Sequence, residues 1–264
     1  MRWEELTAPQ FAHAVETVRG VCVVPVGVIE KHGEHLPLGT DMFWGQRLAD
    51  RAAELEPAII FPPYYFGQIN EAKHQPGTVA VNRRVMLDLL ENICEEIARN
   101  GLRKIVLLSA HGGNRSFLPY FAEALLESER DYVVFLIRGQ DRSASDDPQW
   151  QAMHETQVDQ HAGESETGQM LAIRPELVRM DDLPDKPGDP LGRLAHLPGG
   201  YTGIWWYADF PDHYAGDGKY GTAEKGKFLL ERQAEKVAAI LRAIKQDTVT
   251  ETLTKEFYSR TRHQ

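Results

Sequence analysis

Apolar runs and amphipathic stretches alternate along much of the chain. The valine-rich run at 21–29 is continuous, which is typical of a strand buried on both faces. The predicted strands are 21–29, 58–61, 104–109 and 132–137. One predicted helix begins after Thr40–Asp41. The other predicted helices cover 84–100, 116–127, 167–173 and 222–246. Strands that alternate with helices predict an α/β fold with a mainly parallel sheet covered on both faces.

The length and composition favour one domain. The chain has 264 residues, of which 42% are hydrophobic, so it can bury a substantial core. No Ser/Gly-rich or low-complexity linker interrupts the first 180 residues, so we expect a single domain over 1–264. Residues 181–221 are rich in Pro, Gly and Asp and are predicted to form long loops.

Charge and cysteine content narrow the classes of partner. The formal net charge of -10 disfavours nucleic acid and anionic membranes, because an acidic surface repels both. Cys22 and Cys94 lie in apolar runs, where a small buried hydrophobe is the usual interpretation. The first residues lack the apolar core of a signal peptide, and no run is long enough to span a bilayer. We therefore expect a cytoplasmic protein that acts on a small molecule.

Two polar loops, 30–41 and 110–114, directly follow predicted strands. In open parallel sheets, ligands bind beyond the carboxyl ends of the strands, so both loops should face one crevice. Glu30 and His32 project to the same side of an extended stretch, because residues two apart share a face. Asp41 precedes a helix and is either an N-cap or a ligand; its place after Glu-x-His favours a metal ligand.

His111 lies in Ala-His-Gly-Gly-Asn, after the strand 104–109. Gly112 and Gly113 would let the backbone approach a ligand, although a tight turn with an incidental histidine is an equally good interpretation. His74 and His35 lie in Gly/Pro-rich loops and are expected to line the crevice. The histidines predicted to lie on the surface, without a ligand role, are His13, His154 and His263.

A third polar cluster surrounds His161, with Glu164 and Glu166 three and five residues later. An acidic helix start is often only a solvated feature. Imidazole and carboxylate are nevertheless the ligands that catalytic Zn²⁺ or Mn²⁺ prefers, with one position left open for water. The chain contains no nucleophile elbow, phosphate loop or dinucleotide fingerprint, so a serine hydrolase or a kinase has no support.

With these motifs assembled, the chain resembles the creatininase (creatinine amidohydrolase) family from about residue 21 to residue 227. The motifs are 30–41 (EKHGEHLPLGTD), 74–78 (HQPGT), 110–114 (AHGGN), 161–167 (HAGESET) and 222–226 (TAEKG). The resemblance implies a three-layer α/β/α sandwich, a homo-oligomer that is often a hexamer, and two divalent metal ions per chain. The ions expected are Zn²⁺ or Mn²⁺, with Fe²⁺ as a further possibility.

The resemblance also implies roles for single residues. Glu30, Asp41 and His111 would hold one metal, and His32, Asp41 and a further glutamate the second. His161 would match the histidine that moves protons. Creatininase has a glutamate at the position of Gly113, so the missing carboxylate must come from elsewhere. Glu166 is the first candidate and Glu164 the second.

The function expected is a metal-dependent amidohydrolase that cleaves a non-peptide or cyclic amide C–N bond, and the glycine at 113 argues against assigning creatinine itself. A lyase or isomerase on the same metals, and a non-catalytic metal-binding protein, are the alternatives. Trp205 and Trp206 are predicted either to belong to the core or to form a substrate wall. The predicted substrate-binding residues are His74, Gly112, Gly113, Trp205 and Trp206.

Overall fold

Four parallel strands form the sheet, in the order β2-β1-β3-β4. The strands are β1 (Val21–Val26), β2 (Ile59–Ile60), β3 (Lys104–Ser109) and β4 (Val133–Arg138). The structure, a computed structural model, describes residues 1–139 and 147–261. Each predicted strand is confirmed, although the first ends at Val26 and the second is only two residues long.

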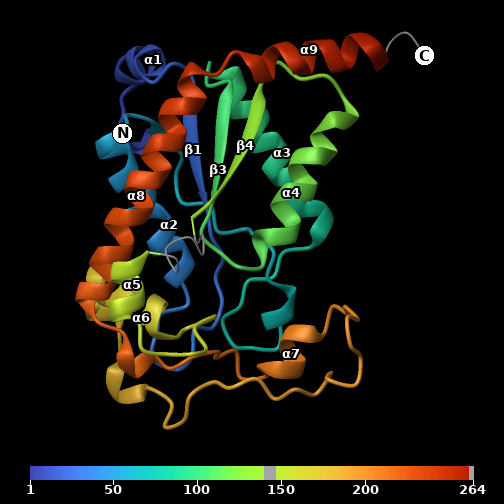
Figure 1. Cartoon of the computed structure of the whole chain (residues 1–264). Helices are drawn as coiled ribbons and strands as arrows, with labels where there is room; N and C mark the ends of the chain where they lie inside the picture. The colour runs from blue at the N-terminus through green and yellow to red at the C-terminus, as the bar shows by residue number, and fades with distance from the viewer. Residues whose placement is uncertain (140–146, 262–264) are drawn as a thin grey trace.

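Helices flank the sheet and close its two ends (Figure 1). They are α1 (Ala8–Thr17), α2 (Thr40–Leu55), α3 (Arg83–Arg99), α4 (Asn114–Ala124), α5 (Pro148–Met153), α6 (Glu164–Ile173), α7 (Trp205–Asp209), α8 (Ala223–Gln246) and α9 (Val249–Thr261). Helix α7 corrects the expectation of loops throughout 181–221. In the described part of the chain, no helix is long and apolar enough to cross a membrane.

The alternation of side chains along the strands creates two separate cores. Cys22 and Val24 of β1 pack with α1, α3 and α4 on one face of the sheet. Val21 and Val23 face the other side and pack with α2 and α8. Because neighbouring strand residues point to opposite faces, one apolar run can serve both layers. The three-layer α/β/α sandwich is thereby confirmed.

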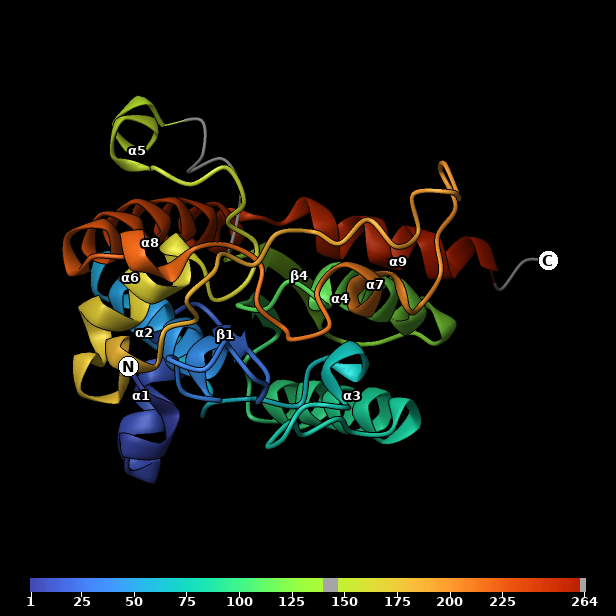
Figure 2. The ribbon, with the colours of Figure 1, turned by 90° about the horizontal axis from the view of Figure 1, so that it is seen from below.

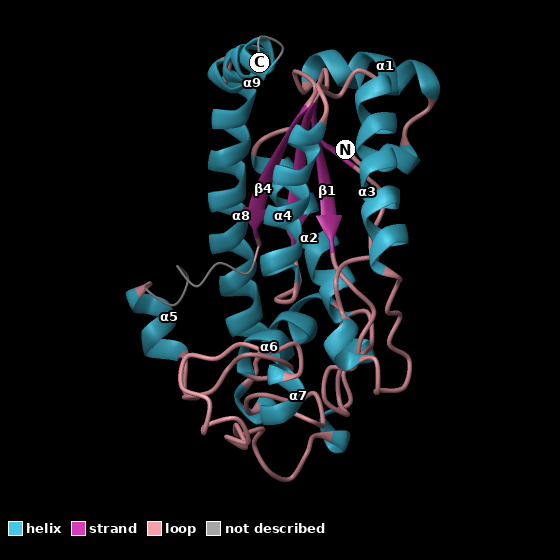
Figure 3. Ribbon diagram, turned by 90° about the vertical axis from the view of Figure 1, so that its right-hand side faces the viewer, coloured by secondary structure: helices cyan, strands magenta, loops and turns pink. Residues whose placement is uncertain are grey.

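The chain leaves the sheet in opposite directions after its two central strands. The segment after β1 continues into α2, which packs on one face, whereas the segment after β3 continues into α4 on the other. In open α/β sheets, the carboxyl ends of two adjacent strands with this divergence are where ligands bind. The arrowheads of the strands point toward the end of the molecule that carries α6 and α7, as Figure 3 shows, and Figure 2 views that end directly.

Two glycines let α2 lie close to the strand ends. A Cβ atom on Gly27 would lie 2.8 Å from the backbone nitrogen of Met42, and one on Gly45 would lie 2.8 Å from the Cβ of Ala110. Any larger side chain would push the first turn of α2 away from β1 and β3. This close packing places Asp41, in the first turn, at the carboxyl end of the sheet.

A buried ion pair fixes α6 against α8. Lys225 Nζ lies 2.5 Å from Glu164 Oε1 and also donates to the carbonyl oxygen of Tyr220 at 3.0 Å. Glu164 is fully buried and accepts hydrogen bonds from the backbone N–H groups of Glu155 and Thr156. Removing Lys225 would leave the charge of the fully buried Glu164 without its ion-pair partner, which is strongly destabilising.

His35 ties the loop after β1 to α6. Its Nε2 atom lies 2.8 Å from Thr167 Oγ1, and the side chain is buried. Burial, and then the charge of His32, lower the pKa of His35 to about 4. In the unfolded chain a histidine titrates near pH 6.5. The unfolded state therefore binds this proton first as the pH falls.

We expect the free energy of unfolding to decrease between about pH 6.5 and pH 4, in part through His35. The variant His35→Gln keeps a polar side chain but does not titrate, so its loss of stability over this window should be smaller than that of the wild type. Urea unfolding at pH 7 and pH 4.5 measures both. Equal losses in the two proteins would contradict the assignment.

Candidate metal centre

Three segments bring four polar side chains together at the carboxyl end of the sheet. Glu30 and His32 come from the loop after β1, Asp41 from the first turn of α2, and His111 from the turn after β3. His111 Nδ1 lies 2.9 Å from Glu30 Oε1 and 2.8 Å from Asp41 Oδ2. All four side chains are buried. The structure thus brings together the residues predicted for the first metal.

Several atoms of this group have no hydrogen-bond partner. They are Glu30 Oε1, Asp41 Oδ2, His32 Nε2 and His111 Nε2, and each is completely buried. Glu30 Oε1 and Asp41 Oδ2 approach one imidazole nitrogen without forming a hydrogen bond to it. Buried polar atoms are normally paired, so unpaired lone pairs that converge on one space fit a cation there. Glu30, Asp41 and His111 could hold one.

A second group adjoins the first. His32 Nε2 lies 3.3 Å from Asp41 Oδ1 and 3.7 Å from Glu166 Oε2, and His161 Nδ1 lies 3.8 Å from the same Glu166 oxygen. Asp41 therefore presents Oδ2 to His111 and Oδ1 to His32. A carboxylate with one oxygen directed into each of two adjacent groups has the arrangement of a bridging ligand.

Backbone carbonyl groups fix which nitrogen of each histidine carries the proton. His32 Nδ1 lies 3.2 Å from the carbonyl oxygen of Glu30, and His161 Nε2 lies 2.8 Å from that of Lys31. A carbonyl oxygen only accepts, so both of these nitrogens donate. The opposite nitrogens, His32 Nε2 and His161 Nδ1, keep their lone pairs and face the carboxylates. Outer hydrogen bonds of this kind orient histidine ligands.

The carboxylates strongly favour the charged form of two histidines. Burial lowers the pKa of His32, but the charge of Asp41, followed by those of Glu166 and Glu30, outweighs burial and raises this pKa to about 10. Burial also lowers the pKa of His111, but the charges of Glu30 and Asp41 outweigh burial and raise this pKa well above its usual value. In the absence of a metal ion, the negative charges of the carboxylates would stabilise an additional proton on each of these two imidazole rings.

His161 and Glu166 behave differently because burial dominates their titration. Burial, and then the charge of His32, lower the pKa of His161 well below its usual value. Burial raises the pKa of Glu166 to about 7, against the opposing effect of His32. His161 is therefore a neutral base at neutral pH, with its Nδ1 lone pair directed toward the cluster.

The structure separates the two glutamates that the sequence left as alternatives. Glu166 lies in the second group with His32 and His161. Glu164 points away from it and pairs with Lys225. The geometry therefore favours Glu166 as the further carboxylate.

The turn after β3 has no room for a side chain at residue 113. A Cβ atom on Gly113 would lie 2.5 Å from His111 Nε2 and 2.8 Å from Glu71 Oε1. A Cβ atom on Gly112 would meet nothing within 4 Å, so this exposed glycine borders open space. A glutamate at 113 would require this turn to move.

The remaining histidines divide between surface and structural positions. His74 is exposed, and its Nε2 lies 2.8 Å from the carbonyl oxygen of Pro211, so it anchors a loop instead of lining the cluster. His13 is exposed, as expected. His154 is half-buried and its Nε2 lies 3.1 Å from Asp159 Oδ2, so the expectation of a surface position was wrong. His263 lies outside the described residues.

Trp205 and Trp206 begin the short helix α7, where the sequence suggested a loop or an alternating strand. Trp206 is buried, and its ring lies edge-on to that of His161 with the centroids 5.9 Å apart. Trp205 is only half-buried. One tryptophan thus packs against the cluster from the side of α7, and substrate contact by either remains a prediction.

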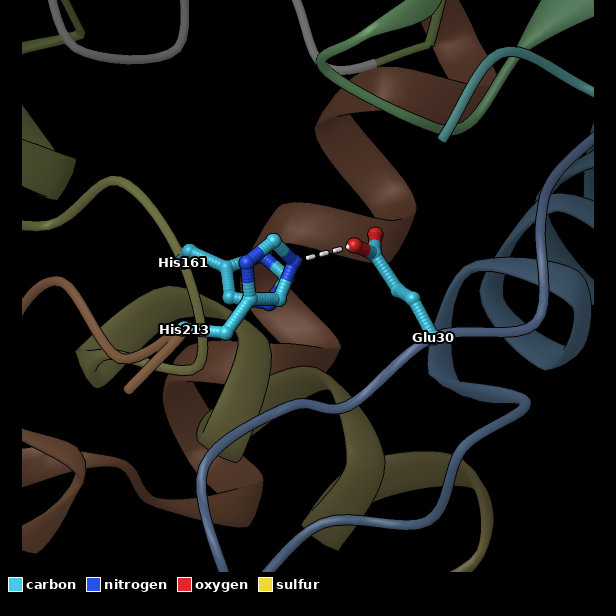
Figure 4. Close-up of side chains that lie close together, drawn as sticks. All are labelled: Glu30, His161 and His213. Atoms are coloured by element: carbon cyan, nitrogen blue, oxygen red, sulfur yellow. Dashed lines mark hydrogen bonds and ion pairs between the residues drawn. The ribbon is translucent and has the colours of Figure 1, made fainter. Parts of the chain in front are cut away.

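His213 also belongs to the site, although the sequence pattern did not predict it. Its Nε2 lies 2.5 Å from Glu30 Oε2, and its ring centroid lies 4.4 Å from that of His161 (Figure 4). His213 adopts a φ of 55°, which is uncommon for a residue other than glycine. The available signal was a histidine within Pro-Asp-His-Tyr-Ala-Gly, close before the motif at 222–226. It lay in a segment without periodicity.

Comparisons with known proteins identify the family of this chain. A family model described as "Creatininase: Creatinine amidohydrolase" matches residues 4–241. Creatinine amidohydrolase of Pseudomonas putida is 28% identical over 196 residues, which cover 69% of this chain and 75% of the relative. Mycofactocin precursor peptide peptidase of Mycolicibacterium smegmatis is 32% identical over 181 residues, 65% of each chain. The 3-dehydro-scyllo-inosose hydrolase of Thermotoga maritima is 26% identical over 250 residues, 84% and 76%.

Solved structures show the same fold. A creatinine amidohydrolase (creatininase) superposes with a TM-score of 0.80 at 24% identity, covering 94% of this chain and 98% of its own. A mutant creatininase of Zn-Zn type gives 0.80 at 24% identity, with coverages of 93% and 98%. A creatininase described as Mn gives 0.78 at 24% identity, with 93% and 99%. Since the family model spans almost the whole chain, this protein belongs to the creatininase family of hydrolases.

Proposed function

We propose that the protein is an amidohydrolase that uses two divalent metal ions to cleave a non-peptide or cyclic amide. The observation that carries this proposal is the orientation of Asp41, which directs one buried oxygen toward His111 and the other toward His32. Zinc and manganese forms of creatininase support the class of ion. Carboxylate and imidazole suit both ions.

Each ion would have its own ligands around the shared carboxylate. Glu30, Asp41 and His111 would hold one ion, and His32, Asp41 and Glu166 the other. Bound divalent cations supply Lewis acidity, which polarises a carbonyl group and lowers the pKa of a coordinated water. The buried, unpaired atoms of Glu30, His32 and Asp41 match that requirement.

His161 would move the proton. Its Nε2 is held by the carbonyl oxygen of Lys31, so the exchange takes place at Nδ1. Because its pKa lies well below the usual value, the ring is neutral and can accept a proton from water. The same atom can then return the proton to the leaving nitrogen. Because both proton transfers use Nδ1, the ring keeps one orientation throughout the reaction.

The names of the relatives guide the choice of substrates to test. The relatives are named for creatinine, for a precursor peptide and for an inosose, and all three names describe hydrolysis or peptide cleavage. Purified, metal-loaded protein should be screened against lactams, formamides and sugar-derived carbonyl compounds. If the protein hydrolyses none of these compounds, the proposed activity is contradicted.

We also propose a cytoplasmic homo-oligomer, with a hexamer expected. The segment before α7 exposes several large apolar side chains, namely Leu191, Leu197, Tyr201 and Ile204. Clustered apolar side chains on a surface favour burial against another chain. Cys22 and Cys94 are free thiols, in agreement with a reducing compartment. A stable monomer in light scattering would contradict the assembly.

Metal content tests the ligand assignment. Asp41→Ala should lose both ions because it removes the bridging carboxylate, whereas Glu166→Gln should lose about one equivalent. Elemental analysis of dialysed protein measures both. Glu164→Gln is the matched control: it should retain both ions and yet unfold at a lower urea concentration, because it weakens the buried pair with Lys225. Near-normal metal in Asp41→Ala would refute the bridge.

Kinetics test the role of His161. On whichever substrate the screen identifies, His161→Asn should lower kcat by about 10²- to 10⁴-fold, the usual contribution of a proton-transfer group. Its metal content should stay near that of the wild type. If kcat is unchanged, His161 does not transfer the proton. If one equivalent of metal is lost instead, His161 is a ligand of the second group.

A further inference from the structure

His213 forms a third group of possible ligands with Glu30 and His161. Glu30 thus belongs to two groups at once, because Oε1 faces His111 while Oε2 faces His213. Whether His213 binds a metal ion or only orients Glu30 depends on which of its two ring nitrogens carries the proton.

The indole of Trp206 settles this point. Its Nε1 donates a hydrogen bond to His213 Nδ1 at 2.8 Å, and both side chains are buried. An indole N–H is only a donor, so Nδ1 must be the accepting nitrogen of the ring. The proton of the neutral imidazole therefore lies on Nε2.

The proton on Nε2 is directed at Glu30. Nε2 and Glu30 Oε2 are 2.5 Å apart, so His213 donates to this oxygen (Figure 4). The bond occupies Oε2 and leaves Oε1 buried without a hydrogen-bond partner, 2.9 Å from His111 Nδ1. His213 Nε2 has no remaining lone pair with which to bind a cation.

We infer that Trp206 and His213 are positioning residues that hold Glu30 with Oε1 turned toward the metal centre, and that His213 is not itself a ligand. The inference rests on the proposed metal site and deepens it. It also gives Trp206 a role other than the predicted substrate wall, since its one polar atom is used inside the protein. The indole acts on Glu30 only through the imidazole.

Contacts from two other segments hold the backbone around His213. The carbonyl oxygen of Pro211 accepts a hydrogen bond from Gln75 Nε2 and lies 2.8 Å from His74 Nε2. The backbone N–H of His213 donates to Phe210, and its carbonyl oxygen accepts from Gly33. The ring is therefore placed by the loops that follow β1 and β2, which explains how a residue at φ 55° stays in position.

The test compares metal affinities of intact variants by competition with a chromogenic chelator, using Zn²⁺ and Mn²⁺ in turn. Trp206→Phe keeps the ring but removes the N–H, and His213→Leu removes the donor to Glu30. Each substitution should lower the affinity for one of the two ions by about 10- to 100-fold, the usual effect of losing an outer hydrogen bond to a metal ligand. The other ion should be bound as in the wild type.

Two further variants separate positioning from folding. Trp205→Phe is the matched control, because it removes a neighbouring, half-buried indole outside this chain of hydrogen bonds, and its affinities should equal those of the wild type. His213→Gln restores an N–H donor and should recover part of the affinity lost in His213→Leu. Melting temperatures show whether a variant has lost its fold. If His213→Leu does not fold, the affinity of His213→Gln is compared with that of the wild type instead.

Absorption of the Co²⁺-loaded protein distinguishes the two roles of His213. If His213 only orients Glu30, the visible bands of His213→Gln at saturating Co²⁺ should match those of the wild type. Loss of one metal equivalent and a changed spectrum would show that His213 is a ligand. Wild-type affinity in Trp206→Phe would overturn the inference while leaving the proposed function intact. A wild-type protein that binds no divalent ion would overturn both.

Discussion

Two buried carboxylates, Glu30 and Asp41, constrain the whole carboxyl end of the sheet. Their side chains are 0% and 2% exposed, although burying an ionised group without compensation costs several kcal/mol. Burial raises the pKa of Glu30, but the charge of His111 and the hydrogen bond from His213 act against burial, and the pKa lies well below its usual value. Glu30 thus stays charged because histidines surround it, and a divalent cation would satisfy the atoms of Glu30 and Asp41 that have no hydrogen-bond partner.

The fold supplies this concentration of charge through topology. β1 and β3 are adjacent, and the chain leaves them toward opposite faces, so their following loops converge without competing for space. Gly27 and Gly45 let α2 approach closely enough for Asp41 to reach both histidine groups. Helices α6 and α7 lie beyond the arrowheads of the strands (Figure 3) and add Glu166 and Trp206 to the site. The ion pair of Glu164 with Lys225 keeps α6 in place without entering the site.

The sequence predicted the part of the site that depends on strand ends. Glu30, His32 and His111 follow apolar runs, whose periodicity identifies strands and so places the next residues at one edge. His213 could not be found in this way, because its position depends on loop contacts that leave no periodic pattern. The choice between Glu164 and Glu166 likewise depended on Lys225, 61 residues from Glu164 along the chain. Helix α7 was missed because five residues carry too little pattern.

The most direct measurement is anomalous diffraction from crystals of the manganese-loaded protein, recorded near the manganese absorption edge. The account predicts two peaks in each chain, on either side of the Asp41 carboxylate. One should adjoin Glu30 and His111, and the other His32 and Glu166. A single peak between Glu30 and His213, or no peak beside Asp41, would contradict the central claim that this carboxylate bridges two ions.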